Sequence, residues 1–425
     1  MSQAPVAQAT TAAFTRNTTP GAAIAASTGA MAVAGQGEAP LEALHFELVT
    51  ERGQFDALEA DWTALFSRAG KSSQVFQTFN WNWHWANHYL SCAPGGIPGL
   101  KLAIVTARRA GKLVIIWPLV SERMRGITQI FWMGEPVSQY GDVLIDDIPD
   151  SLDALRAGWR FLKSHAKGDI VRLRRVRADA AVAPLMAEIG ALASNQQTAP
   201  YLDLASAETF DAYEQRYSSK ARRNRRRHLR RLEEQGEVQF SRLHGGAAAR
   251  DLAEQALKLK AEWLADRGLV SHAIGDARMT RFFAAAAEAA THPVDCVVSS
   301  LKAQGETAAL DVSFACKGRM AVHVIVFNLK YEKAGVGSLL LEQSIRDAYA
   351  EGTTTIDLMA PGDNYKLDWA DASIDVTDWS RPLTIAGHTY ARIYLGLVRG
   401  QVKKAMAAMP QSLRRLVTGG SNHAA

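Results

Sequence analysis

The order of secondary-structure signals repeats along the chain, and this repeat limits the possible folds more than any other feature. Each half begins with helical spacing of apolar residues, continues with apolar β-type runs, and opens one more helix before a closing strand. In the first half the signals are helices near 55–66 and 81–90, strands at 102–107, 112–120, 127–133 and 142–146, a helix over 151–165 and a strand at 170–176. In the second half they are helices over 219–234, 248–266 and 276–290, strands at 294–301, 307–316 and 320–329, a helix over 336–350 and a strand at 354–359. The pattern predicts an α+β fold of two related domains in tandem, with mainly antiparallel sheets.

Composition sets the outer boundaries of these domains. Residues 1–40 are rich in Ala, Thr, Gly, Pro and Ser and contain two charged residues, so we expect a disordered tail. The domains are predicted at 41–200 and 201–385. Residues 386–425 form a basic tail whose helical spacing is amphipathic. Such a tail can lie on an anionic membrane surface or pack back onto the second domain.

The positive charge is concentrated in two places. Nine Lys or Arg and no acid occur over 216–231, and seven Lys or Arg and no acid occur over 379–425, which leaves −11 for the rest of a chain whose net charge is +5. An acidic protein with two basic elements is not a general nucleic-acid coat, and we expect no specific DNA binding. It is expected to contact anions at defined places.

The basic helix predicted over 219–234 carries positive charge around its whole circumference. Repulsion between like charges destabilises an isolated helix, so an anionic partner is expected. We expect Lys220, Arg223 and Arg226 to bind an anionic part of the substrate, because arginine binds phosphate bidentately. The candidate partners are a nucleotide-linked or lipid-linked saccharide, the phosphates of CoA, a cyclic dinucleotide, an acidic polymer and a membrane surface.

Cysteine usage and hydropathy indicate a cytoplasmic protein, peripheral to the membrane at most. The three cysteines are widely spaced and form no disulfide framework, and no apolar run reaches the length that spans a bilayer. His84 and His88 are spaced i, i+4 but lack the glutamate of an HExxH motif. We therefore expect no metal site.

A glycine-rich turn precedes the helix predicted over 336–350. Gly335 and Gly337 follow a strand, and Val336 and Ser338 lie in the same turn. Glycines allow the backbone to approach a ligand closely, and the free N–H groups of a helix start favour an anion such as a pyrophosphate. A tight turn without a ligand is the alternative.

The order strand, Gly-x-Gly, helix, strand resembles the acyl-CoA pyrophosphate loop of the GNAT acetyltransferase superfamily, with Glu332 where that family usually has Gln or Arg. Other stretches resemble the BioF2-like, CelD-type acetyltransferases of cellulose biosynthesis, which are related to the FemAB-like tandem GNAT proteins. These stretches are FQTFNWNWHW at 76–85, WPLV at 117–120, QYGDVLI at 139–145, YSSKARRNRRRHLRRLEEQG at 217–236 and GDNYK at 362–366. The resemblance covers roughly residues 45–385 and implies two tandem GNAT-like domains.

The resemblance implies transfer of an acyl group from acetyl-CoA, or another acyl-CoA, to an amine or hydroxyl. The expected acceptor is an amino sugar or polysaccharide precursor in exopolysaccharide or envelope biosynthesis. The backbone N–H groups near Val324 and Val326 are expected to polarise the thioester carbonyl, as a splayed strand does in GNAT folds. The resemblance also makes Tyr140 and Asp142 candidate substrate-binding residues.

Four side chains are candidates for the chemistry. His323 lies in an apolar strand and has an ordinary pKa close to neutrality, although such a histidine is often a core residue. Asp311 lies in the neighbouring strand, where a buried carboxylate needs partners. Tyr365 and Lys366 follow a strand end, and Lys366 could pair with a phosphate or the acyl oxygen.

Two other functions remain open from the sequence. FemAB-like proteins transfer amino acids from aminoacyl-tRNA, and the basic helix would suit RNA, although no heptad repeat for their coiled-coil insertion is found here. A non-catalytic effector that binds an anionic nucleotide or polymer would agree with Glu332 in the place of a cation.

Overall fold

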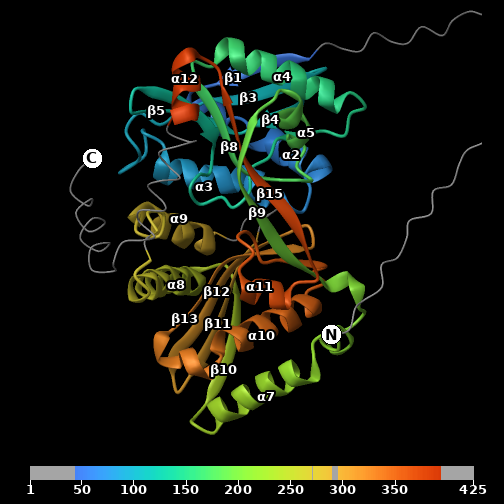
Figure 1. Cartoon of the computed structure of the whole chain (residues 1–425), viewed down its shortest axis with the longest axis vertical. Helices are drawn as coiled ribbons and strands as arrows, with labels where there is room; N and C mark the ends of the chain where they lie inside the picture. The colour runs from blue at the N-terminus through green and yellow to red at the C-terminus, as the bar shows by residue number, and fades with distance from the viewer. Residues whose placement is uncertain (1–43, 270, 290–294, 394–425) are drawn as a thin grey trace, which may run out of the picture. The chain divides into compact units, whose positions relative to one another are not determined.

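The computed structural model describes residues 44–269, 271–289 and 295–393 (Figure 1). The predicted tail over 1–40 and most of the tail over 386–425 lie outside these ranges. The first half contains strands β1 (His45–Val49), β2 (Lys101–Leu102), β3 (Ile104–Arg109), β4 (Lys112–Trp117), β5 (Leu119–Met124), β6 (Ile127–Trp132), β7 (Leu144–Ile145), β8 (Ile170–Arg177) and β9 (Leu192–Asp203), and helices α1 (Arg52–Asp56), α2 (Glu59–Ala69), α3 (Phe79–Tyr89), α4 (Ser151–His165) and α5 (Ala183–Glu188). The second half contains helices α6 (Phe210–Glu214), α7 (Ser219–Glu233), α8 (Ala247–Asp266), α9 (Ala277–Glu288), α10 (Val336–Ala350), α11 (Asn364–Trp369) and α12 (Ile385–Tyr390), and strands β10 (Val238–His244), β11 (Asp295–Ala303), β12 (Glu306–Cys316), β13 (Arg319–Phe327), β14 (Thr355–Asp357) and β15 (Ala372–Pro382).

Both halves contain the same strand–helix–strand unit. In the first half β6 leads through α4 to β8, and the two strands pair in parallel. In the second half β13 leads through α10 to β14, again with parallel pairing. An antiparallel run precedes the unit in each case, through β5 and β6 or through β11, β12 and β13. The tandem α+β organisation predicted from the repeat is therefore present.

The strands form two sheets, but the sheets do not correspond to the two halves of the chain. The larger sheet has 11 strands in the order β10-β11-β12-β13-β14-β9-β15-β8-β6-β5-β2, and the smaller one has four in the order β1-β3-β4-β7. The chain changes sheet at Pro118, between β4 and β5, where the missing N–H cannot continue a ladder. The predicted strand over 112–120 is thus two strands in different sheets.

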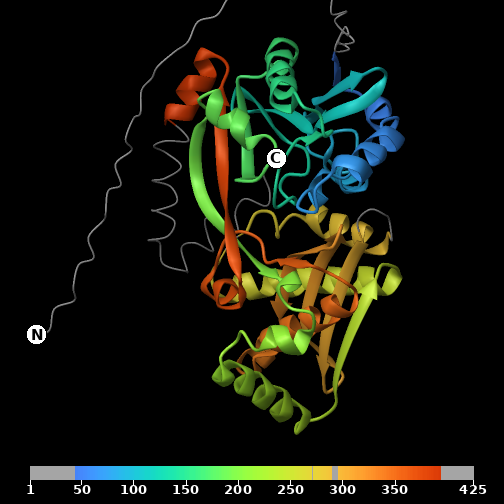
Figure 2. The ribbon, with the colours of Figure 1, turned by 90° about the vertical axis from the view of Figure 1, so that its right-hand side faces the viewer.

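Two long strands join the halves (Figures 1 and 2). β9 pairs with β14 at its end and with β15 along most of its length, and β15 pairs in turn with β8. The boundary predicted between residues 200 and 201 falls inside β9. β15 was not predicted from the sequence, and it carries the chain from the second half back to the first.

The second-half strands are covered on both faces. Alternate residues of β12 point to opposite sides, so that Leu310 belongs to a cluster with Leu257 of α8, whereas Ala309 belongs to a cluster with Leu340 of α10. β13 therefore runs between the helical layers of α8 and α10, at the place where the candidate site lies.

The aromatic segment at 76–85 is core rather than ligand-binding surface. Trp81 of α3 is 2% exposed, and its ring lies 4.8 Å from both Phe282 and Phe314, centroid to centroid. Its indole N–H donates to Ser138 Oγ at 2.9 Å. The segment thus packs α3 against α9 and the second-half sheet.

Candidate active site

The site is built around β13. Beyond the first residues of this strand, one of its edges has no partner strand among the described residues and is called here the open edge. β14 pairs with β13 only from Arg319 to Ala321. The other edge stays paired with β12 as far as Phe327, and the Asn328 N–H extends that ladder to the Ala308 carbonyl at 2.9 Å. Hydrogen-bonded and non-bonded pairs alternate in an antiparallel ladder, so the N–H groups of Ile325 and Phe327 face the open edge.

The prediction for Val324 and Val326 is corrected by this alternation. Their N–H groups face β12, and their side chains belong to the core. His323 is the extra residue of a β-bulge and has no pairing partner in β12, because Ser313 pairs with Val322 and Val312 with Val324. A one-residue insertion of this kind changes which N–H groups face outward, and it cannot be deduced from apolar periodicity.

The glycine turn forms the start of α10. Gly335 has a φ of 67°, which favours glycine, and a Cβ there would come within 3.4 Å of the His228 ring. Ser338 is the first residue of α10 whose N–H forms a backbone hydrogen bond, and it donates to the Gly335 carbonyl at 3.0 Å. The N–H groups of Val336 and Gly337 come before it and are placed to bind an anion. All four residues line a cavity of about 650 Å³, which also reaches Ile325 and Phe327.

The negative charge of Glu332 is compensated by another element. Arg267, just after α8, forms an ion pair with Glu332, and its Cζ lies 4.0 Å from the centroid of the Trp263 ring. Lys260 Nζ lies 4.6 Å from the same ring. Glu332, Trp263 and Lys260 line the 650 Å³ cavity, so α8 supplies positive charge where position 332 does not.

A second cavity of about 340 Å³ meets the first one at the open edge of β13. The two share Ile325, Lys260, Asp363 and Tyr365 among their lining residues. Tyr365 is 47% exposed, and partial burial raises the pKa of its hydroxyl to about 12. The hydroxyl is therefore protonated near neutral pH and available as a donor.

Lys366 lies in the second cavity with its ammonium group held by backbone. Nζ donates to the carbonyls of Met359 at 3.0 Å and Pro361 at 3.1 Å. Burial, together with the positive charges of Lys260 and Arg175, lowers the pKa of Lys366 to about 8, although Asp363 and Asp357 act in the opposite direction. Tyr365 and Lys366 both line this cavity, and their part in the chemistry stays a prediction.

His323 lines the second cavity as a neutral histidine. Its Nε2 lies 2.6 Å from the Val137 carbonyl, which requires the Nε2–H tautomer, and Nδ1 is buried without a hydrogen-bond partner. Aromatic rings surround it, and burial lowers the pKa of His323 to about 4. A proton on Nδ1 would be strongly disfavoured, so His323 is a weak general base whose hydrogen bond ties the two halves together.

Asp311 lies away from both cavities, contrary to the prediction that it acts on the acceptor. The carboxylate is fully buried under α10, where it accepts from the hydroxyls of Ser313 at 2.6 Å and Ser344 at 3.3 Å. Burial raises the pKa of Asp311 to about 6. The partners expected for a buried carboxylate are present, and they give it a structural role.

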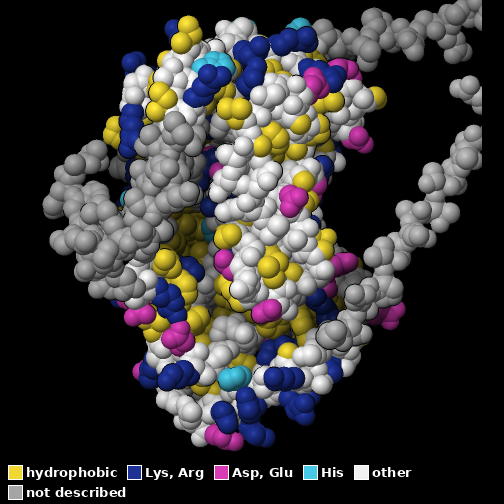
Figure 3. Space-filling view, viewed as in Figure 1, with side chains coloured by type: hydrophobic (Ala, Val, Ile, Leu, Met, Phe, Trp, Pro, Cys, Tyr) yellow, Lys and Arg dark blue, Asp and Glu magenta, His cyan; other side chains and the backbone are white. Residues whose placement is uncertain are grey.

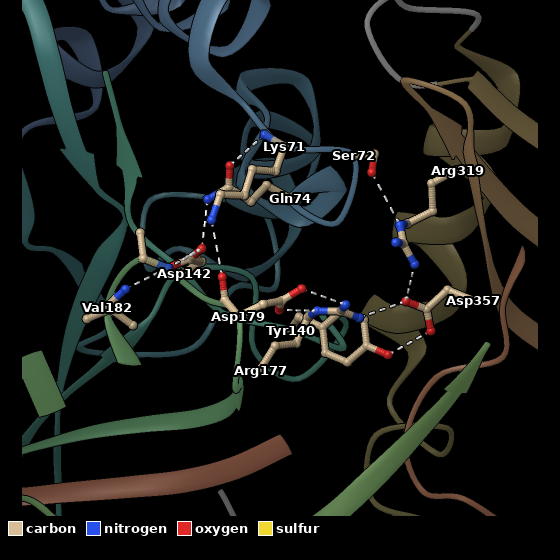
Figure 4. A network of polar contacts seen from close by, with 11 residues as sticks. Lys71, Ser72, Gln74, Tyr140, Asp142, Arg177, Asp179, Val182, Arg319 and Asp357 are labelled. Atoms are coloured by element: carbon tan, nitrogen blue, oxygen red, sulfur yellow. Dashed lines mark hydrogen bonds and ion pairs between the residues drawn. The ribbon is translucent and has the colours of Figure 1, made fainter. Parts of the chain in front are cut away.

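Tyr140 and Asp142 also belong to the interior rather than to a substrate surface (Figure 4). The Tyr140 hydroxyl donates to Asp357 at 2.8 Å, and Asp357 also accepts from Arg177 at 2.9 Å and from Arg319 at 3.2 Å. Tyr140 and Asp142 are 4% and 5% exposed. Their predicted contact with substrate is therefore not supported by the geometry.

Asp142 has a full set of donors of its own. It accepts from the Gln74 side chain at 2.7 Å and from the N–H groups of Val143, Ala181 and Val182 at 2.8, 3.1 and 3.1 Å. These bonds join three segments of the first half. Burial nevertheless raises the pKa of Asp142, because the hydrogen bonds offset the lost hydration only in part.

The basic helix α7 has an inner and an outer face. Arg225 is buried, with Nε 2.8 Å from Glu342 and its guanidinium against the rings of Tyr217 and Trp369. Lys220, Arg223 and Arg226 are exposed on the outer side, where dark blue side chains gather at the lower end of the molecule in Figure 3. Positive charge thus covers the outer face, while the inner face borders the Gly335 turn through a pocket of about 260 Å³.

Several residues of the site carried no recognisable signal in the sequence. Arg175, Lys260, Trp263 and Arg267 lie outside every motif described above, and they reach the cavities from β8, from α8 and from its end. An arginine in a strand at φ 54° is unusual, but backbone conformation is not written in a single sequence. Within the described ranges, no helix is long and apolar enough to cross a membrane, and no group of His, Cys, Asp or Glu could hold a metal ion.

Comparison with known proteins agrees with the geometry of the second half. Residues 219–367 match the family model of the GNAT acetyltransferase domain, Acetyltransf_6. No curated protein matches the sequence. Among solved structures, FemX has a TM-score of 0.54 and 10% identity, with 82% of this chain and 99% of FemX covered.

Two further structures have lower scores. A tandem GNAT protein from the clavulanic acid biosynthesis pathway has a TM-score of 0.46 and 13% identity, with 80% of this chain and 99% of that chain covered. The L-PGS structure from Bacillus licheniformis has a TM-score of 0.48 and 11% identity, with 80% and 96% covered. The likeness to FemX shows a shared fold across both halves. The chain therefore has the predicted α+β fold of tandem GNAT-like domains, and residues 219–367 of its second half match the model of the GNAT acetyltransferase domain.

Proposed function

We propose that the protein is an acyl-CoA-dependent N-acyltransferase that acts on an amino sugar or polysaccharide precursor in exopolysaccharide or envelope biosynthesis. The observation that carries this proposal is the meeting of two cavities at the open edge of β13. One of them reaches the N-terminus of α10, and the other reaches Lys366. A cosubstrate whose pyrophosphate and thioester are separated by a pantetheine arm fits this arrangement.

Different groups of the site would bind acetyl-CoA, polarise its thioester and protonate its sulfur. The N–H groups of Val336 and Gly337 would hold the pyrophosphate of acetyl-CoA, and those of Ile325 and Phe327 would donate to the thioester carbonyl as it gains negative charge. The acceptor nitrogen forms a C–N bond as the C–S bond breaks. The amine proton would leave to water, and Tyr365 would donate its proton to the CoA thiolate and be reprotonated from water, so that the protons balance.

The outer face of α7 is proposed to hold the phosphate of a nucleotide-linked or lipid-linked saccharide. Arg223 and Arg226 line a shallow pocket of about 360 Å³ together with Arg222, Gln215 and Ser219. Phosphate is the anion that neighbouring guanidinium groups bind best. A cyclic dinucleotide would satisfy the same groups. An anionic membrane surface near the C-terminal tail is a further proposed partner.

Calorimetric titration of acetyl-CoA, followed by a thiol-release assay with amino-sugar acceptors, tests the proposal. Gly337→Ala is the informative variant, because a Cβ there lies 3.5 Å from the Phe327 ring at the cavity wall and the substitution is favourable in a helix. Gly53→Ala is the matched control, since its Cβ meets nothing within 4 Å. We expect Gly337→Ala alone to weaken acetyl-CoA binding, by roughly tenfold. Absence of binding by the wild type at millimolar acetyl-CoA would refute the proposal and favour a non-catalytic effector.

An aminoacyl transferase is the second candidate, favoured by the shared fold with FemX and by the exposed arginines of α7. RNA would contact this face through its phosphates, and its affinity would fall steeply with salt. Transfer from a charged tRNA, together with absence of acetyl-CoA binding, would select this candidate over the first.

A further inference from the structure

The second cavity, of about 340 Å³ and the smaller of the two that meet at β13, is lined by more cationic than anionic side chains. Arg175, Lys260 and Lys366 line it, and Asp363 is the single carboxylate among its lining residues. Within the described part of the chain, none of these three side-chain cations forms an ion pair with a carboxylate within 4.0 Å. Their contacts are to neutral groups, and His323 beside them is neutral.

Arg175 is held in the cavity by neutral acceptors. Its guanidinium donates to the Gln139 side chain at 2.5 Å and to the Ser138 carbonyl at 3.3 Å. Its backbone N–H donates to Asp378 at 2.8 Å, within a stretch where Arg175 has a φ of 54°. This left-handed turn in β8 directs an arginine from the first half toward the reaction edge of the second half. Unusual backbone of this kind is concentrated at functional sites.

The cations are close enough to influence each other. The charges of Lys260 and Arg175 both lower the pKa of Lys366, while Asp363 acts in the opposite direction. The three cations are half-buried, and the nearby carboxylates, Asp357 and Asp363 near Lys366 and Glu135 and Asp378 near Arg175, offset their charge only in part. The convergence of the cations in a cavity beside the acyl-transfer edge is accounted for by a bound anion that neutralises them.

We propose that the acceptor of the acyl group carries an anionic group, a carboxylate or a phosphate monoester, that binds Arg175 and Lys366 in the smaller cavity. Its amine then lies at the open edge of β13 near Ile325. A cavity of about 340 Å³ accommodates one small acidic unit rather than a polymer segment. The inference rests on the proposed acyltransferase function and names the class of its acceptor.

Three amines that share one ring test the inference: glucosamine, glucosamine 6-phosphate and 2-amino-2-deoxyglucuronic acid. Each is titrated calorimetrically into protein saturated with CoA, and thiol release from acetyl-CoA is measured in parallel. We expect at least one acidic sugar to bind roughly tenfold more tightly than glucosamine, and Arg175→Gln to remove most of that preference, so that the two affinities differ by roughly twofold or less. The preferred acidic sugar identifies the anion as carboxylate or phosphate.

Two further variants keep the test decisive. Arg175→Lys retains a cation and is expected to retain part of the preference, whereas Arg160→Gln, an exposed change on α4, removes the same charge and should leave the preference unchanged. If CoA binds but neither acidic sugar binds better than glucosamine up to about 10 mM, or if Arg175→Gln leaves the preference intact, the anionic acceptor is refuted while the acyltransferase proposal stands. If CoA itself does not bind, both proposals fall.

Discussion

Replacing Asp357 with Asn tests whether the buried ion network holds the two halves together (Figure 4). One carboxylate oxygen accepts from Arg177 at 2.9 Å and from Arg319 at 3.2 Å, and the other accepts from the Tyr140 hydroxyl at 2.8 Å. Asparagine keeps the size and one acceptor oxygen. Its NH₂ group, however, meets donors in either orientation: two guanidinium groups on one side, or the Met359 N–H on the other.

The magnitude follows from burial. Asp357 and Arg177 are 1% and 5% exposed, so water cannot replace the lost contacts. Breaking a buried ion pair by removing one partner costs about 3–5 kcal/mol. Arg177 keeps a second carboxylate, Asp179, at 2.9 Å, and we therefore expect the lower end of that range. For a chain of this size, about 3 kcal/mol corresponds to a fall in Tm of about 4 °C.

Urea unfolding of Asp357→Asn beside Asp153→Asn measures the effect. Asp153 also forms an ion pair, with Arg156 at 2.6 Å, but its side chain is 73% exposed, so its loss should cost less than about 0.5 kcal/mol. A loss below about 1 kcal/mol for Asp357→Asn would show that the network contributes little to holding the halves together. An equal loss in both variants would show that burial is not the cause.

Two further changes test the site and the basic helix. Because burial lowers the pKa of Lys366 to about 8, its charge is present below pH 8 and is lost above it. The ratio of kcat/KM for an acidic acceptor to kcat/KM for a neutral one should therefore fall about tenfold between pH 7 and pH 9. Lys366→Arg keeps the charge and should remove that fall. Arg225→Met removes the cation next to the half-buried Glu342, while Glu214 keeps Arg226 at 3.4 Å, and we expect a cost of about 3 kcal/mol in urea unfolding. Arg227→Met, on the exposed face, should stay within about 0.5 kcal/mol. Equal stabilities of the Arg225 and Arg227 variants, or an unchanged acceptor ratio across this pH range, would contradict these assignments.

Predictions based on local patterns succeeded where the elements are amphipathic. α4 and α10 begin and end at the predicted residues, and α7, α8 and α9 lie within two residues of their predicted bounds. Helical periodicity is a property of neighbouring residues, so it can be recognised without knowledge of the fold. The position of the glycine turn before α10 could be predicted for the same reason, because a strand, two glycines and a helix follow one another in the chain.

Predictions failed where pairing partners are distant. A strand is predicted from Tyr201, but the first residues of β9 are exposed and mostly polar, so that most of its length does not resemble a strand; β15 alternates only in part. Each is stabilised by its neighbours on both sides, in particular by the other. Asp311 was a candidate because a carboxylate in an apolar segment suggests function, and Tyr140 because its segment resembles a family motif. Their partners Ser344 and Asp357 lie far away in the sequence and could not be foreseen.

The sequence by itself determined the order of elements, the α+β class, the glycine turn and the place of the positive charge. These depend on spacing and composition, which act over a few residues. Only the tertiary structure decided that the bulge at His323 turns Ile325 toward the open edge, that α8 compensates Glu332, and that Arg175 meets Lys366 in one cavity. The physical reason is that an active site is built from long-range pairing and burial, and a one-residue shift in a strand reverses which groups it presents.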